Sequence, residues 1–136
     1  MNKSQLLKAT LIVTSFIFIS LTPVRANDCT VAVESINQLI TKANSALSLN
    51  DFDQVGDIAS DLKYNAQSII NAADSCDCDD AYYTAEVILE NAEAAYLADD
   101  LKESVVFINL LKKEAKSAMT HAKSCGTLVT KVSHSG

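Results

Sequence analysis

The chain carries an internal duplication that shows in the spacing of its four cysteines. A shift of 49 positions superimposes both members of one cysteine pair on both members of the other; the pairs are Cys29 with Cys76 and Cys78 with Cys125. Across the 48 aligned columns 12 residues are identical, including Asp51 on Asp100. Residues 29–76 and 78–125 are therefore two copies of one unit, so the fold must be one that a repeated unit can build.

Each copy has the pattern of a helical hairpin. Apolar residues recur every three or four positions in both halves of each copy, and no strand-like alternation interrupts them. The breaks within the copies fall at Asp51 and Asp100, and Gln54 and Glu103 follow three residues later, which is the spacing of a capping box. We therefore expect two helices in each copy. The predicted ranges are 30–49, 52–75, 80–98 and 101–124.

Four antiparallel helices with short connections predict an all-α fold, an antiparallel four-helix bundle of two duplicated hairpins. The alternative is a two-repeat helical solenoid of the tetratricopeptide kind, which the phrase Asp51-Phe52-Asp53 faintly resembles. The bundle is favoured because two hairpins give a solenoid little stacked core. Gly126 is expected to end the last helix, which would close a helical domain at 27–126 and leave a flexible tail at 127–136.

The N-terminal segment has the features of a cleaved signal peptide. Lys3 and Lys8 precede an apolar run over 9–21 that is too short to span a bilayer comfortably, and Val24-Arg25-Ala26 fits a signal peptidase site. We expect residues 1–26 to be removed. The mature chain is then predicted to be periplasmic or secreted, without a membrane span.

In an oxidising compartment the four cysteines are expected to form two disulfides. An antiparallel hairpin brings the start of its first helix beside the end of its second, which favours Cys29–Cys76 with Cys78–Cys125. The scheme Cys29–Cys78 with Cys76–Cys125 stays open, because all four sulfurs lie at one end of the bundle. A four-thiolate zinc or copper(I) site is a further hypothesis, although one residue between Cys76 and Cys78 is short for metal ligands. The sequence predicts no resident metal.

The charge of the mature chain narrows the range of partners. Cleavage after Ala26 leaves 8 lysines and 17 carboxylates, a net charge of −9, which argues against a nucleic-acid partner. The first half, 27–77, has 2 lysines and 8 acids, whereas 78–136 has 6 lysines and 9 acids. This asymmetry indicates either a solvated surface or a contact with a cationic partner.

No motif brings a nucleophile, a base and an orienting group together. The one histidine in a predicted helix is His121, the chain has no tryptophan, and no haem-attachment motif or complete calcium loop occurs, so no cofactor is expected. The leading hypothesis is a non-catalytic exported helical module that acts through contacts with an unknown protein partner or as a structural component of the envelope. The alternative is a metal or small-ligand binder that uses the cysteine end. A small enzyme built from scattered residues is the third hypothesis.

Overall fold

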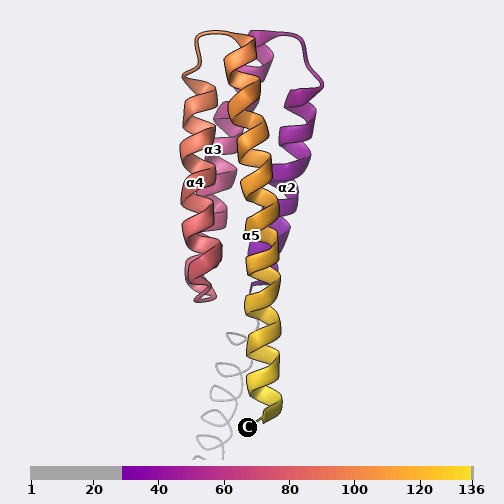
Figure 1. Ribbon diagram of the computed structural model, residues 1–136, viewed down its shortest axis with the longest axis vertical. Coiled ribbons are helices and arrows are strands. Elements are labelled where there is room, and N and C mark those ends of the chain that lie inside the picture. Colours follow the sequence, from indigo (N-terminus) through magenta and orange to yellow (C-terminus); the bar gives the residue numbers. More distant parts are fainter. Residues whose placement is uncertain (1–28, 136) are drawn as a thin grey trace, which may run out of the picture.

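The computed structural model describes residues 29–135 of the chain, with side chains for 29–125. It contains four helices and, over this range, no strand (Figure 1). Their bounds are α2 Thr30–Leu47, α3 Phe52–Ser75, α4 Asp79–Tyr96 and α5 Leu101–Ser135. The predicted all-α four-helix bundle is confirmed, and the predicted signal peptide, 1–26, lies outside the described residues.

The contacts between helices distinguish the bundle from the solenoid. Each helix packs against the next one in the chain, and α2 also packs against α5, which closes a ring of four. A shorter contact joins α3 and α5 across the centre of the ring. In a two-repeat solenoid the first and last helices would lie apart. The α2–α5 contact therefore excludes that alternative.

The core follows from the apolar periodicity and from the size of the residues that carry it. Of the 25 buried apolar residues among the described side chains, 14 are alanines, so the helices can approach one another closely. The larger side chains fill the spaces between the alanine contacts; the largest fully buried ones are Ile36, Leu39, Leu62, Ile69, Ile88, Ile108 and Leu111. The small residues pack tightly in the interior. The charged side chains that could recognise another molecule therefore lie on the surface.

Both predicted capping residues stand at helix starts. The carboxylate of Asp51 accepts from the backbone N–H of Gln54 at 3.3 Å, and that of Asp100 accepts from the N–H of Glu103 at 2.8 Å. In a capping box the carboxylate of Glu103 would accept from the N–H of Asp100. Here it accepts instead from the N–H of Asp99, at 3.2 Å. The second hairpin thus has a displaced capping box, whereas the first has only the Asp half of one.

The prediction that the last helix ends at Gly126 is wrong. The backbone of α5 continues through Gly126 to Ser135, so the described part of the predicted flexible tail is helical and projects beyond the other helices (Figure 1). A single glycine inside a helix costs only about 1 kcal/mol relative to alanine. Gly126 therefore weakens the helix at that point without forcing it to stop.

Candidate functional site

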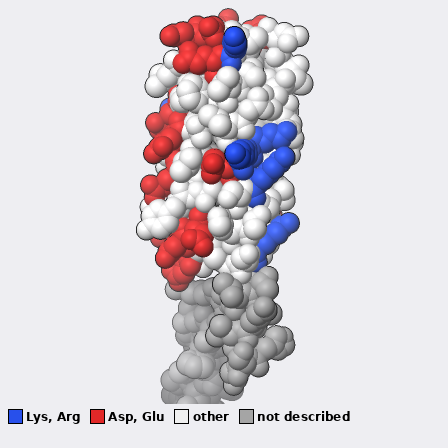
Figure 2. All heavy atoms as spheres, in the orientation of Figure 1, with Lys and Arg blue, Asp and Glu red and all other residues white. Residues whose placement is uncertain are grey.

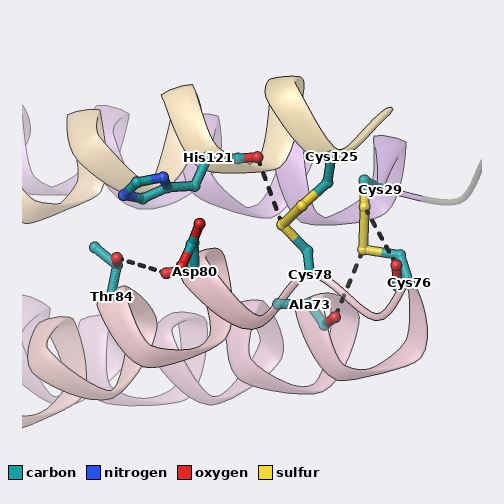
Figure 3. The surroundings of a disulfide bond; sticks show 8 residues. All are labelled: Cys29, Ala73, Cys76, Cys78, Asp80, Thr84, His121 and Cys125. Carbon is teal, nitrogen blue, oxygen red and sulfur yellow. Dashed lines mark hydrogen bonds between the residues drawn. A yellow bond between two sulfur atoms is a disulfide. The ribbon is translucent and has the colours of Figure 1, made fainter. Parts of the chain in front are cut away.

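The predicted disulfide pairing is confirmed. Cys29 is bonded to Cys76 and Cys78 to Cys125, with Cα–Cα separations of 5.3 and 5.9 Å, and both bonds lie at the same end of the bundle (Figure 3). Each bond ties the start of the first helix of a hairpin to the second helix; Cys76 caps the end of α3, whereas Cys125 lies inside α5, which continues to Ser135. In the chain-entropy model a loop of this length stabilises the fold by about 4 kcal/mol.

A tight turn at Asp77 sends the two neighbouring cysteines to different helices. Asp77 has φ 55, a left-handed conformation that aspartate adopts more readily than most residues. The N–H of Cys78 donates to the carbonyl of Ala73 at 2.9 Å, and that of Asp77 to Asp74 at 3.2 Å. This is the Schellman pattern of a helix C-terminus. It ends α3 and allows Cys76 to reach the start of α2 while Cys78 reaches Cys125 within α5.

The cysteine end does not have the chemistry of a thiolate metal site. All four sulfurs are engaged in disulfides, and a disulfide sulfur carries no thiolate to bind zinc or copper(I). Within the described residues, no group of three or more His, Cys, Asp or Glu side chains is placed to hold a metal ion. Of the acids around the turn, Asp79 and Asp80 lie in the first turn of α4, where a negative charge complements the helix dipole, whereas Asp74 and Asp77 lie at the C-terminal end of α3.

His121 is the one histidine whose side chain the structure describes, and its surroundings decide whether it could act as a base. Its Nε2 lies 3.5 Å from Oγ of Ser117, one turn earlier on the exposed side of α5. Figure 3 shows His121 on the side of α5 that faces Asp80 and Thr84 of α4. A separation of 3.5 Å is the outer limit of a hydrogen bond. The contact is therefore a marginal one between two side chains of the same helix.

A groove of about 470 Å³ lies between α2 and α3, close to the Cys29–Cys76 bond. Its lining is neutral and consists of Val31, Ser35, Ser68, Asn71, Ala72 and Ser75. None of its hydroxyl or amide side chains is buried, so a ligand there would compete with water for each hydrogen bond. The groove lacks the buried polar anchors of a selective small-molecule site.

Acidic and basic residues are concentrated on different helices. Together α3 and α4 carry nine carboxylates and one lysine, whereas α2 and residues 101–125 of α5 carry six lysines and three glutamates. The sequence alone indicated an asymmetry between the hairpins. In the structure the division runs across them, because α3 of one hairpin lies beside α4 of the other. Figure 2 shows acids gathered along the α4 side and lysines along the α5 side of one face.

All four tyrosines lie on the same two helices as these acids. Tyr64 and Tyr83 are 74% and 65% exposed, and Tyr96 is half exposed with the ammonium of Lys63 4.9 Å from its ring centre. We call the exposed acids and tyrosines of α3 and α4 the acidic face; its members are Asp53, Asp57, Asp61, Tyr64, Asp74, Asp79, Asp80, Tyr83, Glu86, Glu90, Glu93 and Tyr96. The sequence could have revealed this face if the charges had been counted for each predicted helix instead of for each hairpin.

Comparison of the chain with protein-family models, with curated proteins and with solved structures found no match. Among the described helices, none combines the length and apolar character that crossing a membrane requires. The candidate site is therefore defined by the geometry of this chain alone, and the acidic face is its most distinctive surface.

Proposed function

We propose that this protein is a non-catalytic module, exported to the periplasm or out of the cell, which acts through contacts with a cationic protein partner. The observation that carries the proposal is the acidic face, where nine carboxylates and three exposed tyrosines share the surface with one lysine. Carboxylates attract a basic partner from a distance and increase its association rate. Exposed tyrosines add apolar area that such a partner can cover.

The face already holds one cation of its own. The ammonium of Lys63 lies over the ring of Tyr96 at 4.9 Å, which is within the range of a cation–π contact. Tyr64 and Tyr83 present larger exposed areas beside carboxylates. The same chemistry can therefore accept lysine or arginine side chains from another protein.

The disulfides support the exported location. Disulfides persist in oxidising compartments, and each bond here clamps the open end of one hairpin. The clamp suits a bundle whose interior is mostly alanine, because small side chains bury less apolar area per residue. The alternative of a metal binder at the cysteine end lacks support, since the disulfides remove its thiolate ligands.

A titration with a lysine-rich peptide tests the proposal directly. The chain has no tryptophan and its four tyrosines lie on α3 and α4, so intrinsic tyrosine fluorescence reports on the acidic face. We expect saturable binding that weakens with salt and is absent for a glutamate-rich peptide of equal length. Replacing Asp57 and Asp61 by asparagine should weaken binding about three- to tenfold. The matched control, Glu34→Gln with Glu114→Gln, removes two carboxylates outside the face and should bind as the native protein does.

The natural partner can be sought by crosslinking in the export compartment at low and high ionic strength. The proposal expects capture of a basic protein that is lost at high salt and reduced by the Asp57→Asn, Asp61→Asn variant. Identical partners at both ionic strengths, with no effect of the variant, would show that the acidic face is not the contact surface.

A further inference from the structure

The loop end of the bundle, opposite the disulfides, carries exposed apolar side chains where α3 begins and α4 ends. Figure 1 shows the connection within each hairpin at this end. Phe52, the first residue of α3, is 39% exposed. Tyr96, the last residue of α4, is 48% exposed, and Leu97, which follows it, is 74% exposed. Large apolar side chains exposed together on a small protein indicate a surface that another molecule can cover.

The contact between Lys63 and Tyr96 shows which side of α3 faces this end of α4. The ammonium of Lys63 lies 4.9 Å from the ring centre of Tyr96, so Lys63 lies on the α4 side of α3. Phe52 and Gly56 precede Lys63 by eleven and seven residues, which is close to three and two full helical turns. Both residues therefore lie on the α4 side of α3 as well.

Gly56 leaves the backbone of α3 bare beside these apolar side chains. The antiparallel helices α3 and α4 meet at the turn around Asp77, and Gly56 and Leu97 lie 21 and 20 residues from that turn, so they stand at the same height. A Cβ built on Gly56 meets no described atom within 4 Å. We call Phe52, Gly56, Tyr96 and Leu97 the loop-end patch. It is apolar, and its α3 side is open at Gly56.

The fold itself gives no reason for a glycine at this position. Gly56 lies within α3 without a positive φ, and an added methyl group would meet no described neighbour. Glycine inside a helix is less stable than alanine, and one use of a bare backbone is to let another molecule approach closely. The glycine thus suits a contact surface better than it suits the helix.

Carboxylates surround the loop-end patch. The two segments that carry it, 51–57 and 93–103, contain one lysine, Lys102, and seven exposed acids; these are Asp51, Asp53, Asp57, Glu93, Asp99, Asp100 and Glu103. Figure 2 shows acidic side chains gathered around a basic one at this end, at the top of the view. The ring of Tyr96 already holds the ammonium of Lys63. A molecule that fits the patch therefore combines positive charge with apolar area.

We propose that the loop-end patch binds a cationic amphipathic segment of another protein, in which an apolar side chain lies between lysines or arginines. The apolar side chain covers Leu97 and reaches the bare backbone at Gly56. The flanking cations meet the surrounding carboxylates and the ring of Tyr96. An anionic lipid surface is the wrong occupant, because its headgroups would face the same carboxylates.

This inference rests on the proposed function and makes it more specific, since it names the part of the protein that the cationic partner covers and the kind of segment that covers it. A cationic partner in general needs only the carboxylates, whereas this inference also needs the apolar patch. If a lysine–serine peptide binds as tightly as a lysine–leucine peptide, this inference fails and the proposed function stands. If neither peptide binds, the proposed function fails and this inference fails with it.

Titration of the full disulfide-bonded protein with three peptides of equal length tests the patch. They are a lysine–leucine peptide, a lysine–serine peptide of the same charge, and an uncharged leucine–serine peptide. Tyrosine fluorescence reports binding, because Tyr96 belongs to the patch and the peptides have no aromatic residue. The lysine–leucine peptide should bind at least about tenfold more tightly than the lysine–serine peptide. Equally tight binding of the leucine–serine peptide would show an apolar site that needs no cation, which contradicts the proposal.

A leucine-to-serine pair of variants locates the site without changing any charge. Leu97→Ser should weaken binding of the lysine–leucine peptide about five- to tenfold and leave that of the lysine–serine peptide unchanged. The matched control is Leu110→Ser, which replaces a leucine of α5 that is 44% exposed and lies outside the patch. It should bind both peptides as the native protein does. Equal losses for the two variants would show that the apolar contact is not at the loop end.

A further variant fills the patch instead of truncating it. Gly56→Gln covers the bare backbone with an uncharged side chain and should weaken binding of the lysine–leucine peptide about threefold or more. The variant should fold, because no described atom lies within 4 Å of the added Cβ and glutamine favours a helix more than glycine does; circular dichroism checks this. Native affinity in both Leu97→Ser and Gly56→Gln would refute the proposal. A native dimer that Leu97→Ser dissociates would assign the patch to a second copy of the chain instead.

Discussion

The two hairpins, residues 29–76 and 78–125, share an interior and differ on the surface. At the 49-residue offset the identities gather at buried positions; they include Ala32/Ala81, Ala43/Ala92, Ala46/Ala95, Leu62/Leu111, Ala66/Ala115 and Ala73/Ala122. Exposed positions differ in charge, and examples are Asn37/Glu86, Thr41/Glu90, Asn44/Glu93, Asp53/Lys102, Tyr64/Lys113 and Gln67/Lys116. Close packing restricts what a buried position accepts, whereas an exposed position can change charge at little cost in stability. The duplicated scaffold thus presents surfaces of opposite sign.

One difference lies inside the core. Val55 is fully buried in the first hairpin, and the corresponding residue of the second is Ser104, also fully buried. Oγ of Ser104 donates to the carbonyl of Ala95 at 3.0 Å. The equivalent carbonyl, that of Ala46, accepts instead from the backbone N–H of Leu49 at 3.1 Å. The two hairpins satisfy the same helix-end carbonyl by different donors, so the apolar valine and the polar serine are each suited to their own copy.

The largest predicted effect tests whether the two disulfides are equivalent. Each bond spans the same sequence separation, 47 residues, so Cys29→Ala with Cys76→Ala and Cys78→Ala with Cys125→Ala should each lower the free energy of unfolding by about 4 kcal/mol. Urea denaturation of both double variants under identical conditions measures this. Losses that differ by more than about 1 kcal/mol would show that packing around one bond, rather than loop entropy, controls its contribution.

The next effect concerns the core difference. Ser104→Ala removes the donor to the Ala95 carbonyl and should lower the free energy of unfolding by about 1–3 kcal/mol, because a buried carbonyl is left without a partner. Ser124→Ala, an exposed serine on the same helix, is the control and should change stability by less than about 0.5 kcal/mol. Equal stability of the two variants would mean that water or a backbone donor replaces the hydroxyl.

The helix caps give a smaller effect that should differ between the hairpins. Asp51→Ala and Asp100→Ala should each cost about 1 kcal/mol, since Asp51 accepts from the backbone N–H groups of Asp53 and Gln54 and Asp100 accepts from that of Glu103. The loss at Asp100 should be the larger. Removing its carboxylate also loosens the first turn of α5, where the carboxylate of Glu103 accepts from the backbone N–H of Asp99. Thermal unfolding measures both, and Asp57→Ala, an exposed acid inside α3, is the control. A larger loss at Asp51 would contradict this account.

The smallest effect is a gain in stability in the first hairpin. Gly56 lies inside the first turns of α3, and a Cβ built on it meets no atom within 4 Å. Gly56→Ala should therefore raise the free energy of unfolding by about 0.4–1 kcal/mol through the lower entropy of the unfolded chain. Chemical denaturation with an unchanged slope would confirm this origin. A loss of stability would show that the start of α3 needs the freedom of glycine.

Much of the local structure could be predicted from the sequence because its signals lie within a few residues of one another. The second predicted helix, 52–75, agrees with α3 at both ends, and the first and third were predicted two residues too long at their C-termini. At the end of α2 the N–H of Ser48 donates to the carbonyl of Ser45, and that of Leu49 to the carbonyl of Ala46, in a tighter final turn. The hairpin geometry also predicted the correct cysteine pairing, since adjacent antiparallel helices place paired ends together.

The sequence by itself determined the duplication, the four helices, the buried face of each and the caps, because periodicity and spacing carry that information locally. Only the tertiary structure decided that α2 packs against α5 and that α3 lies beside α4. That closure places the acids of two hairpins on one side and most of the lysines on the other. A helix specifies which of its faces is buried, whereas the identity of its neighbours depends on how all four buried faces are covered at once.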